Sequence, residues 1–372
     1  MTGRQPRVVI VQERLPHYRV AFFQALLERL AACEIDLAVV HGRSQGAAAH
    51  RRDEGSLPWA QVVSNRVVRV GSASLVQQPV IGITRSADLV IVEQASRMAA
   101  NYPLLVRQAR GGPKVAFWGH GANLQSDGSW HNRASEAAKA CISRLPHWWF
   151  AYTDGCARRV EALGFSAERI TVVENAVDAA SIAVAKARPE PHRAIFVGSL
   201  TSTKRLDLIV QACDLLAAQM PSFSLAIVGD GELRSWVRHH AAARSYITYL
   251  GAKVGSDLGV ELKRSSVMLM PSGVGLGVLD AFAAGIPVVT ATGEGHGPEF
   301  EYLSHGGNSL ITDPNPQSLA SAVLQALDPA RNAALRGGAS RAATRWTVEN
   351  MVENFTEGIL RACHAVHTGV AL

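Results

Sequence analysis

The chain has 372 residues, of which 48% are hydrophobic and 18% are charged. This composition is typical of a globular protein with material for two cores, and it excludes a disordered or fibrous chain. The formal net charge of +6 permits an anionic partner, but the basic residues are dispersed without a known nucleic-acid-binding module, so nucleic acid is not expected as a partner.

The cysteines and the apolar runs indicate where in the cell the protein is expected. The five cysteines are scattered and never spaced C-x-x-C, which argues against a disulfide framework or a zinc site. The apolar run near the N-terminus, Val8 to Val11, is shorter than the ~7–15 residues of a signal peptide core. No stretch approaches the ~18 apolar residues of a membrane span. The sequence therefore predicts a cytoplasmic protein that is at most peripherally attached to a membrane.

Short β-branched runs alternate with helical patterns along the first half of the chain. A predicted helix over residues 18–30 places Phe22 and Leu26 on one face, a second helical pattern covers 135–142, and Asp154 is the predicted N-cap of a third. The predicted strands of this half are 7–12, 35–41, 89–93, 115–118, 149–152 and 170–173. Several of them are continuously apolar, which is typical of a parallel sheet covered on both faces.

Residues 178–193 lose this alternation and collect proline and charge, so we interpret them as a linker. The alternation then restarts. The predicted strands of the second half are 194–197, 224–228, 247–250, 267–270 and 287–290. Five helices are predicted in this half. The first begins after Lys204, the second begins after Asp230, the third covers 257–263, the fourth lies around Asp280 and the fifth covers 347–363.

Two successive series of strands and helices predict two doubly wound α/β domains. We divide the chain into an N-terminal Rossmann-like domain over residues 1–185 and a C-terminal one over 186–345, with a helix over 346–372 that packs back across the domain junction. Ligands of open parallel sheets bind beyond the carboxyl ends of the strands. The residues that follow each strand are therefore the candidate site residues.

The loop after the strand 194–197 is suited to an anion. It reads GSLTSTKR over residues 198–205 and leads into a helix. Free backbone N–H groups and the helix dipole favour negative charge there, and Lys204 adds a full positive charge. An ordinary loop with a solvated lysine has the same pattern, so this loop alone leaves both interpretations open.

A second loop, after the strand 267–270, is rich in glycine. Gly273, Gly275 and Gly277 alternate with larger residues and let the backbone approach a ligand closely. Asp280 falls early in the following helix, where its carboxylate could accept two hydrogen bonds from a sugar diol. A carboxylate that only stabilises the helix dipole is the alternative.

An ordered series of motifs resembles the GT4 family of retaining glycosyltransferases, which have the GT-B fold. The second half contains VGSLTSTKR, AIVGDGEL, YLGAK, DAFAAGIPVV and HGPEFEYL, and the first half contains LPHYRVAFFQAL, FWGHG and VVENAVD. The resemblance implies two Rossmann-like domains that face each other across a donor-binding cleft. It also implies transfer of a sugar from a nucleotide-diphosphate sugar to a lipid-linked or polysaccharide acceptor. The anomeric configuration would be retained, and no metal or other cofactor would be needed.

The resemblance also implies roles for single residues. Lys204 and the amides of Gly275 and Leu276 would hold the donor diphosphate, Asp280 would bind the ribose hydroxyls, and the loop 251–253 would lie beside the base. The donor-binding residues implied in this way are Ser199, Gly251, Lys253, Ser272, Gly275, Leu276, Gly277, Asp280 and Glu299.

In the first domain, His120 lies between two glycines directly after the strand 115–118. The resemblance implies that it touches the donor sugar near the reacting carbon, which makes His120 and Lys204 the expected catalytic residues. His17, Tyr18 and Arg19 follow the first strand and are expected on the acceptor side. A helix start with exposed polar residues is the alternative for these three.

The chain departs from the family pattern in two ways. The family has two glutamates eight positions apart where this chain has Ser272 and Asp280, and many members have an arginine where this chain has Ser199. Glu299 or Glu301 could replace the missing acid. Two alternatives therefore stay open. One is a catalytically silent GT-B protein that binds a nucleotide sugar or supports a partner enzyme. The other is a sugar-nucleotide 2-epimerase, although its acid/base carboxylate pattern is not found here.

Arginines of the first half suit an acidic membrane surface that carries a lipid-linked acceptor. They are Arg51, Arg52, Arg66 and Arg69. A solvated face is the commoner explanation for such residues.

Overall fold

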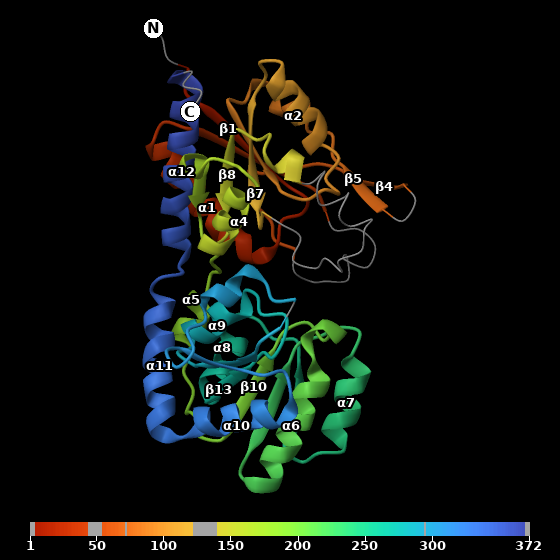
Figure 1. Cartoon of the computed structure of the whole chain (residues 1–372), viewed down its shortest axis with the longest axis vertical. Helices are drawn as coiled ribbons and strands as arrows, with labels where there is room; N and C mark the ends of the chain where they lie inside the picture. The colour runs from red at the N-terminus through yellow and green to blue at the C-terminus, as the bar shows by residue number, and fades with distance from the viewer. Residues whose placement is uncertain (1–3, 44–53, 71–72, 122–139, 294, 369–372) are drawn as a thin grey trace. The chain divides into compact units, whose positions relative to one another are not determined.

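The chain folds into two compact units in a computed structural model that describes residues 4–43, 54–70, 73–121, 140–293 and 295–368 (Figure 1). The first unit comprises Met1–Ala176 and Val348–Leu372, and the second comprises Val177–Thr347. The units thus divide before Val177, earlier than the expected division after residue 185. The C-terminal helix belongs to the first unit.

The first unit contains a seven-stranded parallel sheet with the strand order β3-β2-β1-β6-β7-β8-β9. Its strands are β1 (Arg7–Gln12), β2 (Asp36–His41), β3 (Gln61–Val62), β6 (Leu89–Glu93), β7 (Lys114–Gly119), β8 (Trp148–Ala151) and β9 (Ile170–Val172). All six strands predicted for this half are confirmed, with ends that agree to within one residue. The sequence did not predict β3 or the antiparallel hairpin of β4 (Arg66–Val70) and β5 (Ala73–Gln77).

Successive residues of β1 point to opposite faces of this sheet and so contribute to two cores. On one face, Val8 and Ile10 pack against α1 (Val20–Ala32) and α12 (Val348–Thr368), which lie side by side. On the other face, Val9 and Val11 pack in a core that includes residues of α2 (Asn101–Ala109) and α4 (Asp154–Ala162). The sheet is therefore covered on both sides, as its continuous apolar strands require.

Three helix predictions of the first half need comment. Asp154 is not the N-cap of α4. The cap is Thr153, whose side chain accepts a hydrogen bond from the backbone N–H of Cys156, and Asp154 is the first residue of the helix. The predicted helix over 135–142 lies mostly outside the described residues. The first turn of the predicted helix 18–30 is a 3-10 helix, η1 (His17–Arg19), ahead of α1.

The second unit contains a six-stranded parallel sheet with the strand order β12-β11-β10-β13-β14-β15. Its strands are β10 (Arg193–Val197), β11 (Ser224–Val228), β12 (Ile247–Gly251), β13 (Val267–Leu269), β14 (Val288–Ala291) and β15 (Ser309–Thr312). The five strands predicted for this half are confirmed, and β15 was not predicted.

Helices cover both faces of the second sheet. One core joins it to α6 (Leu206–Gln219), α7 (Arg234–Ala242) and α10 (Pro316–Leu327). The other core joins it to α5 (Ala180–Val184), α8 (Gly255–Arg264), α9 (Gly277–Ala283) and α11 (Pro329–Ala343). The presence of α5 shows that the predicted linker 178–193 is partly helical. Within the described residues, no helix is long and apolar enough to cross a membrane.

Candidate functional site

The strand order of the second unit reverses between β10 and β13. Connections run to opposite sides at such a switch point, which leaves a crevice at the carboxyl ends of the two strands where ligands bind. The loop GSLTSTKR follows β10 and the glycine-rich loop follows β13. The topology therefore brings the two loops that the sequence singled out to the two sides of one crevice.

Lys204 joins these two loops. It ends the short 3-10 helix η5 (Ser202–Lys204), and its ammonium group donates a hydrogen bond to the carbonyl oxygen of Gly273. Burial lowers the pKa of Lys204, and the negative charge of Glu299 opposes this shift. Glu299 is only 4% exposed. The cation is thus hydrogen-bonded to the glycine-rich loop at the switch point, where the charge of a buried carboxylate acts on it.

The glycine-rich loop is fixed by its neighbours at two further points. The N–H of Val274 donates to Nδ1 of His296 at 3.2 Å, and its carbonyl oxygen accepts from the N–H of Gly297 at 2.6 Å. Gly273 has a φ of +62°, and a Cβ at this position would lie 2.9 Å from Nζ of Lys204. A residue other than glycine would therefore be strained at 273 and would also displace the cation. A role for His296 was not predicted from the sequence, because its hydrogen bond with Val274 joins residues that are 22 positions apart.

Asp280 lies in α9, directly after this loop. Burial raises its pKa to about 7, and within the described residues its carboxylate forms no hydrogen bond or ion pair. A carboxyl group in this state can accept or donate hydrogen bonds to ligand hydroxyl groups.

The other predicted donor-side residues lie along the same carboxyl edge of the sheet. Ser199 is exposed in the loop after β10, and Ser272 and Leu276 are half-buried in the loop after β13. Gly251 ends β12 with a φ of +69°, and Lys253 follows it two residues later. The remaining predicted residues, Gly275 and Gly277, bracket the start of α9. Glu301 is exposed, in contrast to Glu299.

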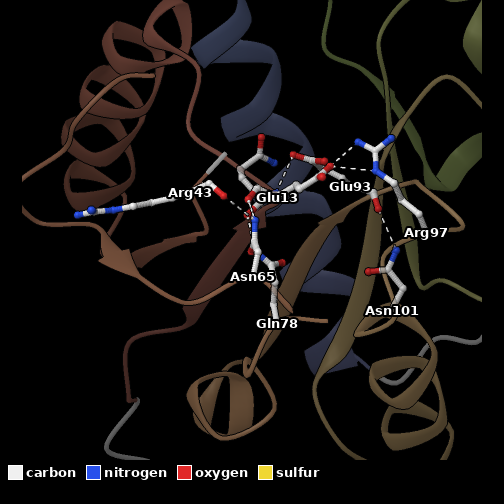
Figure 2. A network of polar contacts seen from close by, with 8 residues as sticks. Glu13, Arg43, Asn65, Gln78, Glu93, Arg97 and Asn101 are labelled. Atoms are coloured by element: carbon white, nitrogen blue, oxygen red, sulfur yellow. Dashed lines mark hydrogen bonds and ion pairs between the residues drawn. The ribbon is translucent and has the colours of Figure 1, made fainter. Parts of the chain in front are cut away.

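The strand order of the first unit reverses between β1 and β6, and a polar network lies at that point (Figure 2). The carboxylate of Glu93, at the end of β6, accepts from the N–H of Glu13 at 3.1 Å. The side chain of Glu13 pairs with Arg97, and its carbonyl oxygen accepts from Asn65 at 2.9 Å. Burial raises the pKa of Glu93 to about 7. This network was not predicted from the sequence, although Glu13 directly follows the first predicted strand and Glu93 ends the third.

His120 directly follows β7, so it lies at the carboxyl edge of the first sheet. Its ring packs against Tyr152 with centroids 4.7 Å apart. Burial, with a contribution from the positive charge of Arg159, lowers the pKa of His120 to about 4. Its Nδ1 is buried and has no hydrogen-bond partner within the described residues. His120 is therefore a neutral imidazole at pH 7 with unused hydrogen-bonding capacity.

The expected acceptor-side residues of η1 differ from one another. His17 is exposed and Tyr18 is half-buried, whereas Arg19 is 4% exposed. The guanidinium of Arg19 donates to Oδ1 of Asn175 at 2.6 Å and lies 4.6 Å from the ring centroid of Trp118. Arg19 thus holds the interior of the first unit together, and this placement departs from the expected acceptor contact.

The structure describes two of the four arginines proposed for a membrane surface. Arg66 and Arg69 are exposed on β4. Arg51 and Arg52 lie outside the described residues.

Comparison with known proteins identifies the part of the chain that carries the switch-point loops. Residues 191–329 match the family model of glycosyl transferases group 1. This segment therefore resembles a group 1 glycosyltransferase domain. Glycogen synthase of Mycobacterium tuberculosis is 31% identical over 191 residues, which cover 49% of this chain and 45% of the relative. The amylovoran biosynthesis glycosyltransferase AmsK of Erwinia amylovora is 25% identical over 178 residues, which cover 44% of this chain and 43% of AmsK. The chain thus spans less than half the length of these curated relatives.

The solved structures extend the likeness to nearly the whole chain. HepE of Anabaena, in complex with UDP, aligns with a TM-score of 0.68 at 16% identity and covers 95% of this chain and 99% of its own. Sucrose-phosphate synthase of Thermosynechococcus elongatus aligns with a TM-score of 0.68 at 13% identity and covers 97% and 99%. At this identity the likeness concerns the fold. The chain has the GT-B fold of two parallel-sheet domains that was expected from its motifs.

Proposed function

We propose that this chain is a retaining glycosyltransferase of the GT4 type, which transfers a sugar from a nucleotide-diphosphate sugar to a glycan or lipid-linked acceptor. The observation that carries the proposal is Lys204, which donates to the carbonyl oxygen of Gly273 at the switch point of the unit that matches the group 1 glycosyltransferase model. The names of the relatives support glycan synthesis, and the UDP complex of HepE supports a nucleotide donor.

In the proposed reaction, the bond between the anomeric carbon and the donor phosphate oxygen breaks, and a bond to the acceptor oxygen forms on the same face. Negative charge develops on the leaving diphosphate. Lys204 and the amides of Gly275 and Leu276 stabilise it by preorganised electrostatics. The acceptor hydroxyl proton passes to the departing phosphate oxygen, so the reaction needs neither a general base nor a metal. Turnover that persists in excess EDTA is the expected result, and loss of turnover restored by a divalent cation would contradict it.

The remaining site residues take supporting roles. Asp280 binds the ribose hydroxyls, because its desolvated carboxyl group has no partner among the described residues. His120 binds the donor sugar through a neutral imidazole. Glu299 keeps a negative charge near Lys204 where Ser272 replaces the family's glutamate. Ser199 leaves Lys204 without the arginine that assists it in many members.

The acceptor is proposed to meet the first unit, where Glu13 and Glu93 lie at the carboxyl edge of the sheet (Figure 2). Exposed Arg66 and Arg69 would favour an acidic membrane surface if the acceptor is lipid-linked. We place the protein in the cytoplasm, where nucleotide sugars are available.

A thermal-shift panel of UDP-, GDP-, ADP-, CMP- and dTDP-sugars tests the donor site. A nucleotide sugar at ~100 times its dissociation constant adds about 2.7 kcal/mol to the stability of the state that it binds. We expect one nucleotide class to raise the melting midpoint of the wild type and of Lys263→Ala, but not of Lys204→Ala. Lys263 is a matched control, because it also donates to a backbone carbonyl of the second unit, that of Ala183.

Two outcomes would favour the alternatives. Tight binding with neither transfer nor donor hydrolysis indicates a silent binding protein. An epimerised sugar nucleotide formed without acceptor indicates a 2-epimerase. No shift with any nucleotide sugar would contradict the donor site itself.

A further inference from the structure

The loop that follows β13 is held in place by a histidine that has no role in the proposed chemistry. His296 lies between β14 and the 3-10 helix η6 (Pro298–Tyr302). Its Nδ1 lies 3.2 Å from the backbone nitrogen of Val274, and its Nε2 lies 3.0 Å from the carbonyl oxygen of Ala291. The imidazole thus connects the end of β14 to the glycine-rich loop.

These two partners determine the protonation state of the ring. A carbonyl oxygen can only accept, so Nε2 carries a hydrogen and donates it to Ala291. The N–H of Val274 can only donate, so Nδ1 has no hydrogen and accepts. A doubly protonated ring has no acceptor nitrogen. The contact with Val274 therefore exists only while His296 is neutral.

The surroundings of His296 favour this neutral form. Burial lowers the pKa of the ring, the hydrogen bond to the carbonyl oxygen of Ala291 partly opposes this shift, and the positive charge of Lys204 lowers the pKa further. Within the described residues, Lys204 is the charged group that acts on the ring, and Glu299 acts in turn on Lys204. Phe300 packs against the ring with centroids 4.4 Å apart, which adds no charge.

Val274 is the point of the loop at which such a contact matters. It separates Gly273, whose carbonyl oxygen accepts from Lys204, from Gly275, the first of the amides proposed to bind diphosphate. Its side chain is buried, and its own carbonyl oxygen is tied to the N–H of Gly297. A Cβ at Gly297 would lie 2.8 Å from that oxygen, so the two segments are in close contact.

We propose that His296 is a positioning residue, whose neutral imidazole holds the glycine-rich loop in its anion-binding conformation and whose protonation releases the loop. The consequence for donor binding rests on the proposed function, whereas the contact itself does not. Protonation would also place a second positive charge near the diphosphate. Simple electrostatics and release of the loop thus make opposite predictions for donor affinity in acid.

Amide hydrogen exchange of peptides that cover residues 271–278 tests the contact without any ligand. After correction for the intrinsic rate, we expect the wild type to exchange faster at about pH 5.5 than at about pH 7.5, as the ring becomes protonated. His296→Ala should exchange roughly 10-fold faster than the wild type at the higher pH, because one hydrogen bond is lost.

His296→Asn provides the decisive comparison. Its Oδ1 has the same relation to Cβ as Nδ1 of histidine and cannot be protonated in this range, so exchange should stay slow at both pH values. His305→Asn is the matched control, because Nδ1 of His305 accepts from the N–H of Ile311 at 3.0 Å, outside the glycine-rich loop. If His296→Asn shows the same pH dependence of exchange as the wild type, the proposal is wrong. This variant decides the question even if His296→Ala fails to fold.

Calorimetric binding of UDP-glucose separates this proposal from the proposed function. We expect the affinity of the wild type, relative to His296→Asn, to fall between about pH 7.5 and about pH 5.5, by less than about 10-fold because the pKa of the ring is lowered from 6.5. A wild type that binds more tightly than His296→Asn in acid would overturn the effect on donor binding. Absence of UDP-glucose binding in every variant would count against a UDP-sugar donor, and hydrogen exchange would still decide the role of His296.

Discussion

The ammonium group of Lys204 donates a hydrogen bond to the carbonyl oxygen of Gly273, so the loops after β10 and β13 are joined across the switch point of the second unit. The two residues are separated by 69 positions in the sequence. A diphosphate that enters this crevice meets a cation whose position is already fixed, which is the arrangement that electrostatic catalysis requires.

Lys204→Ala should reduce sugar transfer at least ~100-fold and leave the fold intact. The substitution removes the positive charge that is proposed to stabilise the leaving diphosphate. Initial rates with saturating donor, together with a urea unfolding curve, measure the two effects separately. Lys263→Ala should transfer at the wild-type rate. A Lys204→Ala variant with near-wild-type turnover would refute the catalytic role.

Gly273→Ala should weaken nucleotide-sugar binding about 10-fold or more. The added Cβ lies 2.9 Å from Nζ of Lys204, and the φ of +62° is unfavourable for alanine. Gly111→Ala introduces the same kind of backbone strain at a φ of +82°, but no atom lies within 4 Å of its added Cβ. If the thermal shift with donor is unchanged in Gly273→Ala, the loop does not hold the diphosphate.

Much of the fold could be predicted from the sequence, because most strands of the two sheets are short apolar runs bounded by polar turns. β1 and β6 were predicted to the residue. β15 was not predicted, because its apolar run within the sequence SLIT is too short to indicate a strand. The helix over Ala180–Val184 was not predicted either, because it lies in the segment interpreted as a linker.

The contacts between distant residues could not be predicted in the same way. Motif order placed Lys204 and the glycine-rich loop at one edge, because parallel strands share that edge. Nothing local indicates that the guanidinium of Arg19 turns inward to Asn175, a residue 156 positions away. The pairing of Glu93 with the N–H of Glu13 spans 80 positions and depends on the strand order.

Arg19→Ala should lower the free energy of unfolding of the first unit by about 2–4 kcal/mol, because it removes a buried charged hydrogen bond and a contact with Trp118. Lysine should not restore stability, since it lacks the planar guanidinium. Urea unfolding followed by tryptophan fluorescence measures the change. Arg29→Ala, which removes an exposed ion pair with Glu353, should lower the free energy of unfolding far less than Arg19→Ala does. If Arg19→Ala keeps wild-type stability and loses only affinity for the acceptor, Arg19 contacts the acceptor as the sequence predicted.

Glu93 should make the first unit less stable as the pH rises. Its pKa is raised from 4.5 to about 7 by burial, so between these values the folded state binds more protons than the unfolded state. Stability from this group is therefore fully present below pH 4.5 and is lost as the pH rises through about 7. Glu93→Gln can still accept from the N–H of Glu13 and should be more stable than the wild type by about 2 kcal/mol at alkaline pH.

Unfolding curves at several pH values check this expectation for Glu93. Glu353→Gln on the exposed face of α12 should leave the wild-type pH dependence unchanged. Parallel pH profiles for the wild type and Glu93→Gln would show that Glu93 titrates normally.

His120→Ala should lose most of its turnover while its nucleotide affinity changes only modestly, because the ring is proposed to contact the sugar and not the diphosphate. Burial lowers the pKa of His120 to about 4, so its ionisation should add no step to the rate profile between about pH 5.5 and about pH 8. His147→Ala is the matched control. It is a half-buried histidine of the same unit whose pKa is also lowered by burial, but it precedes β8 and so lies at the opposite edge of the sheet. Steady-state kinetics with varied donor separate kcat from KM. Equal kinetics of the His120 and His147 variants would make His120 a structural residue, whereas a fall in kcat confined to His120→Ala places its neutral imidazole at the reacting sugar.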